Sequence, residues 1–201
     1  MSNNTKVVRN ASRDALKYVY YVIIGIAITE ALNRAFISNG HFLGLRMLER
    51  SHRIPLILIG AFLPTICRFV HGASIHLDTI SSYRYKPIVD CIGFYLQAIF
   101  FYLMATSLQD PQTFSLSLTA MLILDALWLI FLNHVKYIEF DKTHSQWLIS
   151  NFCLIAILLM LFINCTSFKI VWSFFIFLFA FLAAILDYSF NKDFYFPSSL
   201  S

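Results

Sequence analysis

The sequence predicts an all-α integral membrane protein, a single bundle of about six transmembrane helices with no soluble domain. Of its 201 residues, 59% are hydrophobic and only 13% are charged. Soluble domains average about 45–50% apolar and about 25% charged residues. Several apolar segments approach the ~20 residues that a helix needs to cross ~30 Å of hydrocarbon. Lipid must therefore cover much of the surface, and residues 1–201 are expected to form one polytopic membrane domain.

Six apolar segments are predicted to be transmembrane helices. The turn around Asp110 and Pro111 is tight, because proline fixes φ and aspartate bonds nearby backbone. The connection after the fifth segment is shorter still. Such short connections predict antiparallel hairpins of the third with the fourth segment and of the fifth with the sixth. Connection 38–54 is either an amphipathic interfacial segment or a plain solvated loop. The six segments are 15–36, 55–75, 88–108, 114–135, 147–164 and 168–190.

Basic residues predict the orientation. The side of the membrane that holds the N-terminus collects more Lys and Arg than the other side, where Arg46, Arg50, Arg53 and Lys169 fall. By the positive-inside rule both termini are cytoplasmic, and the expected location is the bacterial inner (plasma) membrane. The basic residues are scattered rather than gathered on one face, so no nucleic acid partner is predicted. The expected partners are the lipid bilayer and, as an open alternative, further copies of the chain in a homo-oligomer.

Polar residues within the predicted helices form the candidate ion- or ligand-binding site. Ionisable groups in hydrocarbon cost at least ~2.5–3.5 kcal/mol each, so they persist where they have partners, water or a function. Odd-numbered segments start on the N-terminal side of the membrane, and even-numbered segments end there. Residues late in an even-numbered segment or early in an odd-numbered one therefore lie in the same half of the bilayer, and Asp125 falls near mid-depth. The candidate residues are Arg68, His71, Asp90, Asp125, Asn151 and Asp187.

This cluster has two interpretations. In the first, it lines a polar cavity open to the cytoplasm, where Asp125 binds a cation or proton and Arg68 is its electrostatic counterweight. In the second, it is an ion-pair and hydrogen-bond network that joins helices. On the opposite side of the membrane, Glu30 and Arg34 are four residues apart and are expected to pair along one helix face.

The leading functional hypothesis is a small channel or transporter-like protein for cations or protons. One alternative is a membrane-embedded sensor or effector that oligomerises or perturbs the bilayer. A weaker alternative is a lipid-directed membrane enzyme that uses His71, His76 and Asp78, but the sequence does not predict a catalytic site. No cofactor or metal is expected, and only six glycines occur, without a nucleotide-binding pattern.

Three residue classes receive structural roles. The four cysteines Cys67, Cys91, Cys153 and Cys165 are expected to be buried small hydrophobes. Small residues that allow close helix contact are Gly25 and Ala27 in the first segment, and Ala180, Ala183 and Ala184 in the sixth. Aromatic residues near segment ends are predicted to form an interfacial belt: Tyr18, Tyr20, Tyr21, Tyr83, Tyr85, Tyr137, Trp147 and Tyr188.

Overall fold

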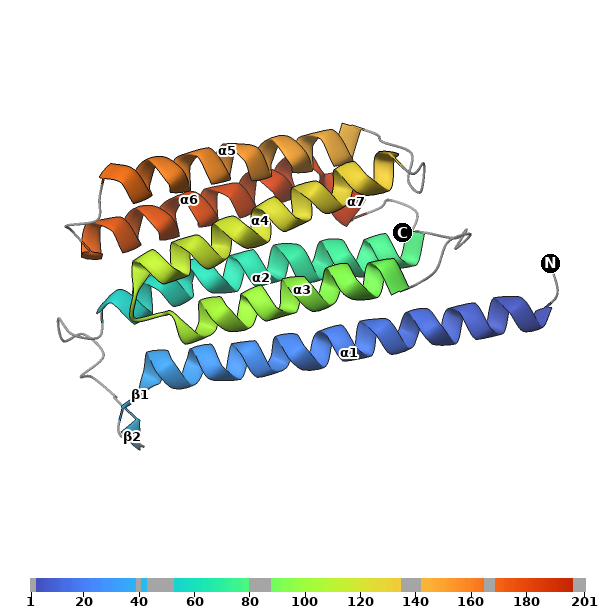
Figure 1. Ribbon diagram of the computed structural model, residues 1–201, viewed down its shortest axis with the longest axis horizontal. Helices are drawn as coiled ribbons and strands as arrows, with labels where there is room; N and C mark the ends of the chain where they lie inside the picture. The colour runs from blue at the N-terminus through green and yellow to red at the C-terminus, as the bar shows by residue number, and fades with distance from the viewer. Residues whose placement is uncertain are drawn as a thin grey trace.

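The described chain is almost entirely helical (Figure 1). A computed structural model describes residues 3–38, 41–42, 53–79, 88–134, 142–164 and 169–196. A two-residue antiparallel pairing joins β1 (Ile37–Ser38) to β2 (His41–Phe42), and most of the predicted 38–54 connection lies outside the described residues. The helices are α1 (Asn3–Phe36), α2 (Arg53–Thr79), α3 (Ile88–Thr106), α4 (Pro111–His134), α5 (Lys142–Asn164), α6 (Lys169–Phe190) and α7 (Lys192–Tyr195).

Every predicted segment coincides with a helix, although the boundaries differ. Helix α1 begins at Asn3, and its polar first turns extend beyond the other helices (Figure 1). Helix α5 begins at Lys142, five residues before the predicted start, and α7 was not predicted. The helices α1, α2, α4, α5 and α6 are long and apolar enough to cross a membrane, whereas the apolar stretch of α3, Asp90–Thr106, is shorter. The apolar helices indicate a membrane-embedded protein.

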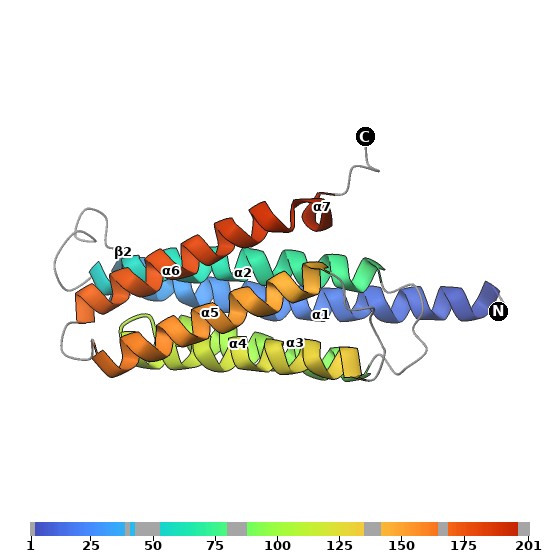
Figure 2. The same ribbon diagram turned by 90° about the horizontal axis from the view of Figure 1, so that it is seen from above.

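The helices run alternately up and down the bundle (Figures 1 and 2). The predicted hairpins are confirmed, because α3 packs on α4 and α5 packs on α6. Helix α1 packs on α3, and α2 packs on both α1 and α6, so the order around the bundle is α1, α3, α4, α5, α6, α2. The long contact between α2 and α6 joins parts of the chain that are far apart in sequence.

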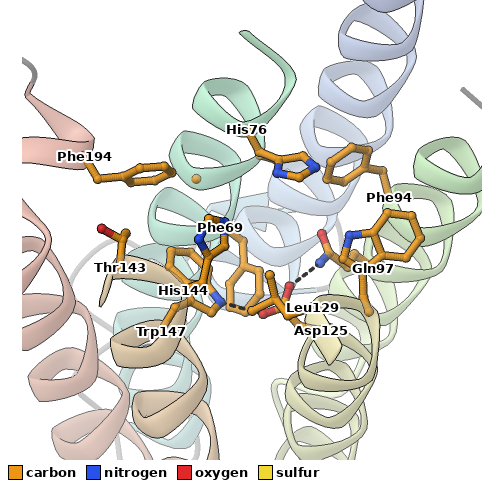
Figure 3. A pocket seen from close by; sticks show the side chains of 13 residues that line it. Phe69, His76, Phe94, Gln97, Asp125, Leu129, Thr143, His144, Trp147 and Phe194 are labelled. Carbon is orange, nitrogen blue, oxygen red and sulfur yellow. Dashed lines mark hydrogen bonds between the residues drawn. The ribbon is translucent and has the colours of Figure 1, made fainter. Parts of the chain in front are cut away.

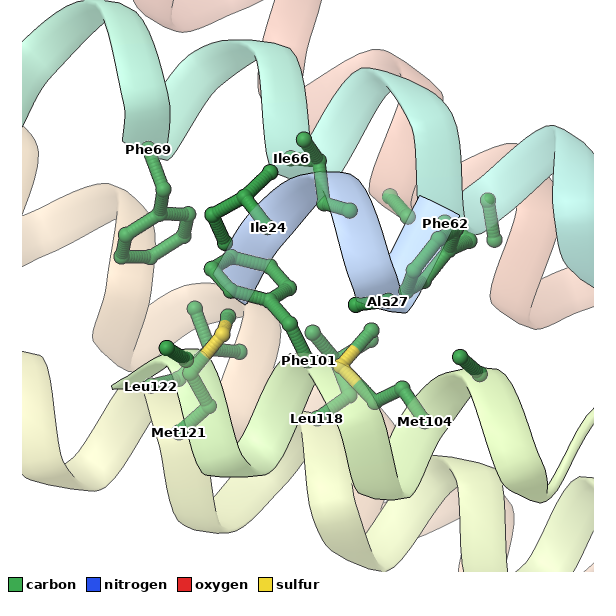
Figure 4. Packing of buried hydrophobic residues seen from close by; sticks show 14 of the residues in the cluster. Ile24, Ala27, Phe62, Ile66, Phe69, Phe101, Met104, Leu118, Met121 and Leu122 are labelled. Atoms are coloured by element: carbon green, nitrogen blue, oxygen red, sulfur yellow. The ribbon is translucent and has the colours of Figure 1, made fainter. Parts of the chain in front are cut away.

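The bundle has an apolar core and an apolar outer surface. Phe62, Phe101 and Leu118 are fully buried in the core (Figure 4). Leu127 and Met160 are among the large apolar side chains that lie more than half exposed on the outside. A monomeric soluble protein rarely exposes so large an apolar area, so this outer surface also indicates a membrane-embedded protein.

Two predictions about small residues are partly wrong. Ala27, Ala180 and Ala184 are buried as expected, but a Cβ added to Gly25 would meet no atom within 4 Å. Gly25 therefore makes no close helix contact. Cys67 and Cys153 are exposed rather than buried, Cys91 is half-buried, and Cys165 lies outside the described residues. A thiol is small and apolar, so a position on the apolar outer surface suits it as well as one in the core.

The α3–α4 turn is built as the sequence predicts. The Asp110 Oδ2 atom accepts hydrogen bonds from the backbone N–H of Thr113, at 3.3 Å, and from its hydroxyl, at 2.6 Å. Asp110 is thus the N-cap of α4, and Pro111 stands at the first helical position, where its missing N–H costs nothing. The Thr113 hydroxyl bond, helped by Lys169, lowers the pKa of the Asp110 carboxyl below its usual range.

Candidate functional site

Arg68 on α2 and Asp187 on α6 form a buried ion pair. The Arg68 Nε atom lies 3.0 Å from Asp187 Oδ2, and both side chains are almost completely buried. A second guanidinium nitrogen of Arg68 donates to Asn151 Oδ1 at 2.9 Å. The guanidinium carbon also lies 4.4 Å from the centre of the Trp147 ring, within cation–π range. These contacts compensate the cost of burying the arginine charge.

The Asp125 carboxylate accepts three hydrogen bonds from three buried side chains. Gln97 Nε2 donates to Oδ1 at 2.8 Å, while Trp147 Nε1 and Asn151 Nδ2 donate to Oδ2 at 2.6 and 2.7 Å. Asn151 therefore bridges Arg68 and Asp125, since its carbonyl oxygen faces the cation and its amide nitrogen faces the carboxylate. A carboxylate offers about four acceptor positions, so Oδ1 retains capacity for one more donor.

The network continues beyond α6. Asp187 accepts a hydrogen bond from Asn191 Nδ2 at 2.7 Å and another from the Tyr195 hydroxyl at 2.5 Å. Burial, together with the negative charge of Asp187, raises the pKa of Tyr195, so its hydroxyl remains a donor at neutral pH. Sequence reasoning missed both residues. Their spacing of four and eight residues from Asp187, which repeats one helix face, was a signal for them.

Two aromatic residues assigned to the interfacial belt lie inside the bundle instead. Trp147 is buried because α5 begins five residues earlier than predicted, at Lys142, which moves the indole more than a turn inward. Tyr20 is also buried, and its hydroxyl donates to Gln97 Oε1 at 3.5 Å. Tyr18, by contrast, is exposed on the outside. We call the connected set the Arg68 network: Tyr20, Arg68, Gln97, Asp125, Trp147, Asn151, Asp187, Asn191 and Tyr195.

The structure joins Arg68, Asp125, Asn151 and Asp187 through hydrogen bonds, whereas the other two candidates, His71 and Asp90, contact other side chains. His71 Nδ1 lies 3.3 Å from the Tyr188 hydroxyl, which itself donates to the backbone carbonyl of Cys67. Asp90 lies beside His76, with 3.9 Å between Asp90 Oδ1 and His76 Nε2. At the opposite end of the bundle, Arg34 Nε pairs with Glu30 Oε1 at 2.5 Å, as the spacing predicts.

The described part of the chain contains no group of side chains that could hold a metal ion. Among residues 3–38, 41–42, 53–79, 88–134, 142–164 and 169–196, no three His, Cys, Asp or Glu side chains are grouped to hold a metal ion. The side chain of Asp78, which the enzyme hypothesis requires beside His71 and His76, lies outside the described side chains.

A cavity of about 70 Å³ leads to Asp125 (Figure 3). Gln97 and Asp125 supply its polar end, and Figure 3 shows them hydrogen-bonded to each other. Its other residues come from α2, α3, α4, α5 and α7, toward the end of the bundle where α1 starts (Figure 1). A volume of ~10–15 Å³ accommodates one water, so this space holds several. The lining residues are Phe69, Gly72, Ala73, His76, Phe94, Gln97, Asp125, Trp128, Leu129, Thr143, His144, Trp147 and Phe194.

Two glycines let two indoles line this cavity. A Cβ on Gly72 would lie 2.7 Å from Cη2 of Trp147, and a Cβ on Gly93 would lie 2.5 Å from Cζ3 of Trp128. Both distances are shorter than carbon atoms tolerate. Glycine is therefore required at each position because the indole rests directly on the neighbouring helix backbone.

Comparison with known proteins gives no match to any protein-family model, curated protein or solved structure. The fold and the site define a helical bundle with a buried carboxylate–arginine network beside a small cavity, and its apolar helices indicate a membrane-embedded protein.

Proposed function

We propose that this chain is a small transporter-like membrane protein for cations or protons. In this proposal α3 also crosses the bilayer, giving six transmembrane helices, and both termini lie in the cytoplasm of a bacterial cell. The observation that carries the proposal is the position of Asp125, a buried carboxylate at the polar end of a cavity within the bundle. A carboxylate held inside a membrane protein and reachable from one side is typical of ion and proton pathways.

The charges of the Arg68 network favour a cation as the bound species. The network contains two carboxylates, Asp125 and Asp187, and one guanidinium, that of Arg68. Arg68 contacts Asp187 directly but reaches Asp125 only through Asn151. Binding of one cation or proton at Asp125 would balance the formal charge of the network. Asp125 is the suitable carboxylate because it lines the cavity and has no direct contact with a cationic side chain among the described residues, whereas Asp187 is already paired with the Arg68 guanidinium.

The apolar core favours a transporter over an open channel. Phe62, Phe101 and Leu118 are fully buried, and Figure 4 shows them packed with Met104 and Met121 between the helices. The side chains of these five residues offer no oxygen ligand to an ion. Access to Asp125 is thus from one side, and passage to the other side requires the helices to rearrange, as in alternating access.

Flux into proteoliposomes tests the proposal. We expect wild-type protein to move protons, Na⁺, K⁺ or methylammonium down an imposed gradient, and Asp125→Asn to abolish that flux while the variant remains folded. Glu30→Gln is the matched control, since Glu30 is likewise a carboxylate within a long helix but stands at the opposite end, and its flux should equal that of wild type. Absence of wild-type flux under all these gradients would overturn the proposal. Ligand-dependent oligomerisation without flux would instead favour the sensor or effector hypothesis.

A further inference from the structure

The walls of the cavity are aromatic, while its end is anionic. Phe69, Phe94, Trp128 and Trp147 line the space that ends at Asp125. Phe94 and Trp128 pack against each other with ring centres 6.3 Å apart, and Phe69 packs edge-on against Trp147 at 5.6 Å. The two aromatic pairs belong to different helices: α3 with α4, and α2 with α5.

We propose that this cavity binds a small organic ammonium ion, with Asp125 as its counter-ion and the aromatic rings as its walls. The inference rests on the proposed function and names the chemical class of its cation. Aromatic faces attract cations, and they suit alkylated ammonium groups, which are recognised through cation–π contacts in aromatic cages. Desolvation within the cavity strengthens this attraction.

The lining argues against a metal cation as the preferred ligand. Hard cations such as Ca²⁺ and Mg²⁺ take six or more oxygen ligands. The side chains around this cavity supply oxygen only from Gln97, Asp125 and Thr143. An alkylammonium ion needs no such shell, because its carbon atoms are satisfied by the rings and its charge by one carboxylate.

Size also fits this ligand class. A cavity of about 70 Å³ holds several water-sized groups, which matches an ion between methylammonium and choline in size. The cavity shape is held by the backbone, because the Trp147 and Trp128 indoles rest on Gly72 and Gly93. A pre-formed cavity loses less conformational entropy on binding than a flexible one.

Binding to the purified chain in nanodiscs of phosphatidylglycerol tests the proposal. Intrinsic tryptophan fluorescence would follow titrations with methylammonium, tetramethylammonium, choline, K⁺ and the uncharged choline isostere 3,3-dimethyl-1-butanol. We expect at least one alkylammonium ion to bind on the order of tenfold more tightly than either K⁺ or the isostere. Equal affinity for K⁺, equal affinity for the isostere, or no saturable alkylammonium binding would each overturn the proposal.

Variants locate the binding. Asp125→Asn and Trp128→Leu should each weaken alkylammonium binding by on the order of tenfold, whereas Tyr95→Leu should leave it unchanged. Tyr95 is the matched control because it is the aromatic residue next to the lining residue Phe94 on α3 but is about half exposed on the outside. Equal loss in all three variants would contradict the assignment. If Asp125→Asn fails to fold, the affinities of the wild-type chain for choline and for its uncharged isostere decide whether the positive charge is recognised.

Two further comparisons distinguish failure of the ligand proposal from failure of the transport proposal, and a lipid headgroup from a free solute. Alkylammonium binding without any flux would refute the transport proposal and leave the ligand site standing, whereas Asp125-dependent proton flux without such binding would do the reverse. Nanodiscs that contain phosphatidylethanolamine identify the source of the ligand. Weaker choline binding in these discs indicates a competing lipid headgroup, and unchanged binding indicates a free solute.

Discussion

The Trp147 indole Nε1 donates a 2.6 Å hydrogen bond to Asp125 Oδ2, and the face of the same indole lies 4.4 Å from the Arg68 guanidinium carbon. One side chain on α5 thus contacts both the anion and the cation of the network through different parts of its ring. This dual contact gives the first of four predictions.

Trp147→Phe should lower the free energy of unfolding by about 1–3 kcal/mol more than Trp172→Phe. The Trp147 change leaves a buried carboxylate with one donor fewer, which costs about that amount. Trp172 is also buried, but its Nε1 has no hydrogen-bond partner among the described residues, so its replacement loses packing alone. Thermal unfolding in detergent measures both variants. Similar destabilisation would show that the Trp147 bond adds no stability.

Arg68→Met and Asp187→Asn should each destabilise the bundle by about 3–5 kcal/mol, because either one leaves a buried charge without its partner. The double variant should cost clearly less than the sum of the two single variants, and a double-mutant cycle measures this coupling. Glu30→Gln is the control, since the half-exposed Glu30–Arg34 pair is worth only about 0–1 kcal/mol. Additive effects of the Arg68 and Asp187 variants would argue against direct pairing.

Gly72→Ala and Gly93→Ala should each destabilise the protein by about 1–3 kcal/mol, because the added methyl group collides with an indole ring. Gly25→Ala should instead stabilise it by about 0.5–1 kcal/mol, since nothing lies within 4 Å and alanine favours the helix. Tryptophan fluorescence should shift only in the first two variants. A stabilising Gly72 or Gly93 variant would contradict the close packing.

Asp110→Ala should cost about 0.5–2 kcal/mol through loss of the α4 N-cap, whereas Asp110→Asn should cost less because asparagine also caps helices. The lowered pKa of Asp110 means that its charge stabilises the fold above the unfolded pKa of 3.8, and this contribution is lost as pH falls toward the folded pKa. The difference between wild type and Asp110→Asn should therefore shrink below about pH 4. Unfolding curves across this range test it, and a constant difference would contradict it.

The sequence predicted which helices carry polar groups. It was less successful in predicting which of these groups contact one another. The depth argument placed Arg68, Asn151 and Asp187 in one half of the bundle, and all three belong to the network. The same argument included His71, but that ring points to Tyr188. Depth along a helix follows from residue number, whereas the direction of a side chain depends on which helix is its neighbour.

The main errors in the predictions concern residues that suit both the membrane interface and the interior of the bundle. Trp147 and Tyr20 satisfy the pattern of an interfacial belt and also the requirements of a buried hydrogen-bond donor. Only the early start of α5, at Lys142, and the packing of α1 on α3 decide for the interior. Tyr195 required knowledge that the chain continues past α6 into α7 and returns its hydroxyl to Asp187.

By itself the sequence determined the helical class, the approximate segments and the α3–α4 and α5–α6 hairpins, because hydrophobic length and short turns are local properties. The tertiary structure alone decided the order of helices around the bundle, in which α2 lies between α1 and α6. That order brings Arg68 to Asp187, 119 residues away in the chain. Helix packing depends on the fit of whole surfaces, such as Gly72 against Trp147 and Gly93 against Trp128, and no periodicity within one segment contains that information.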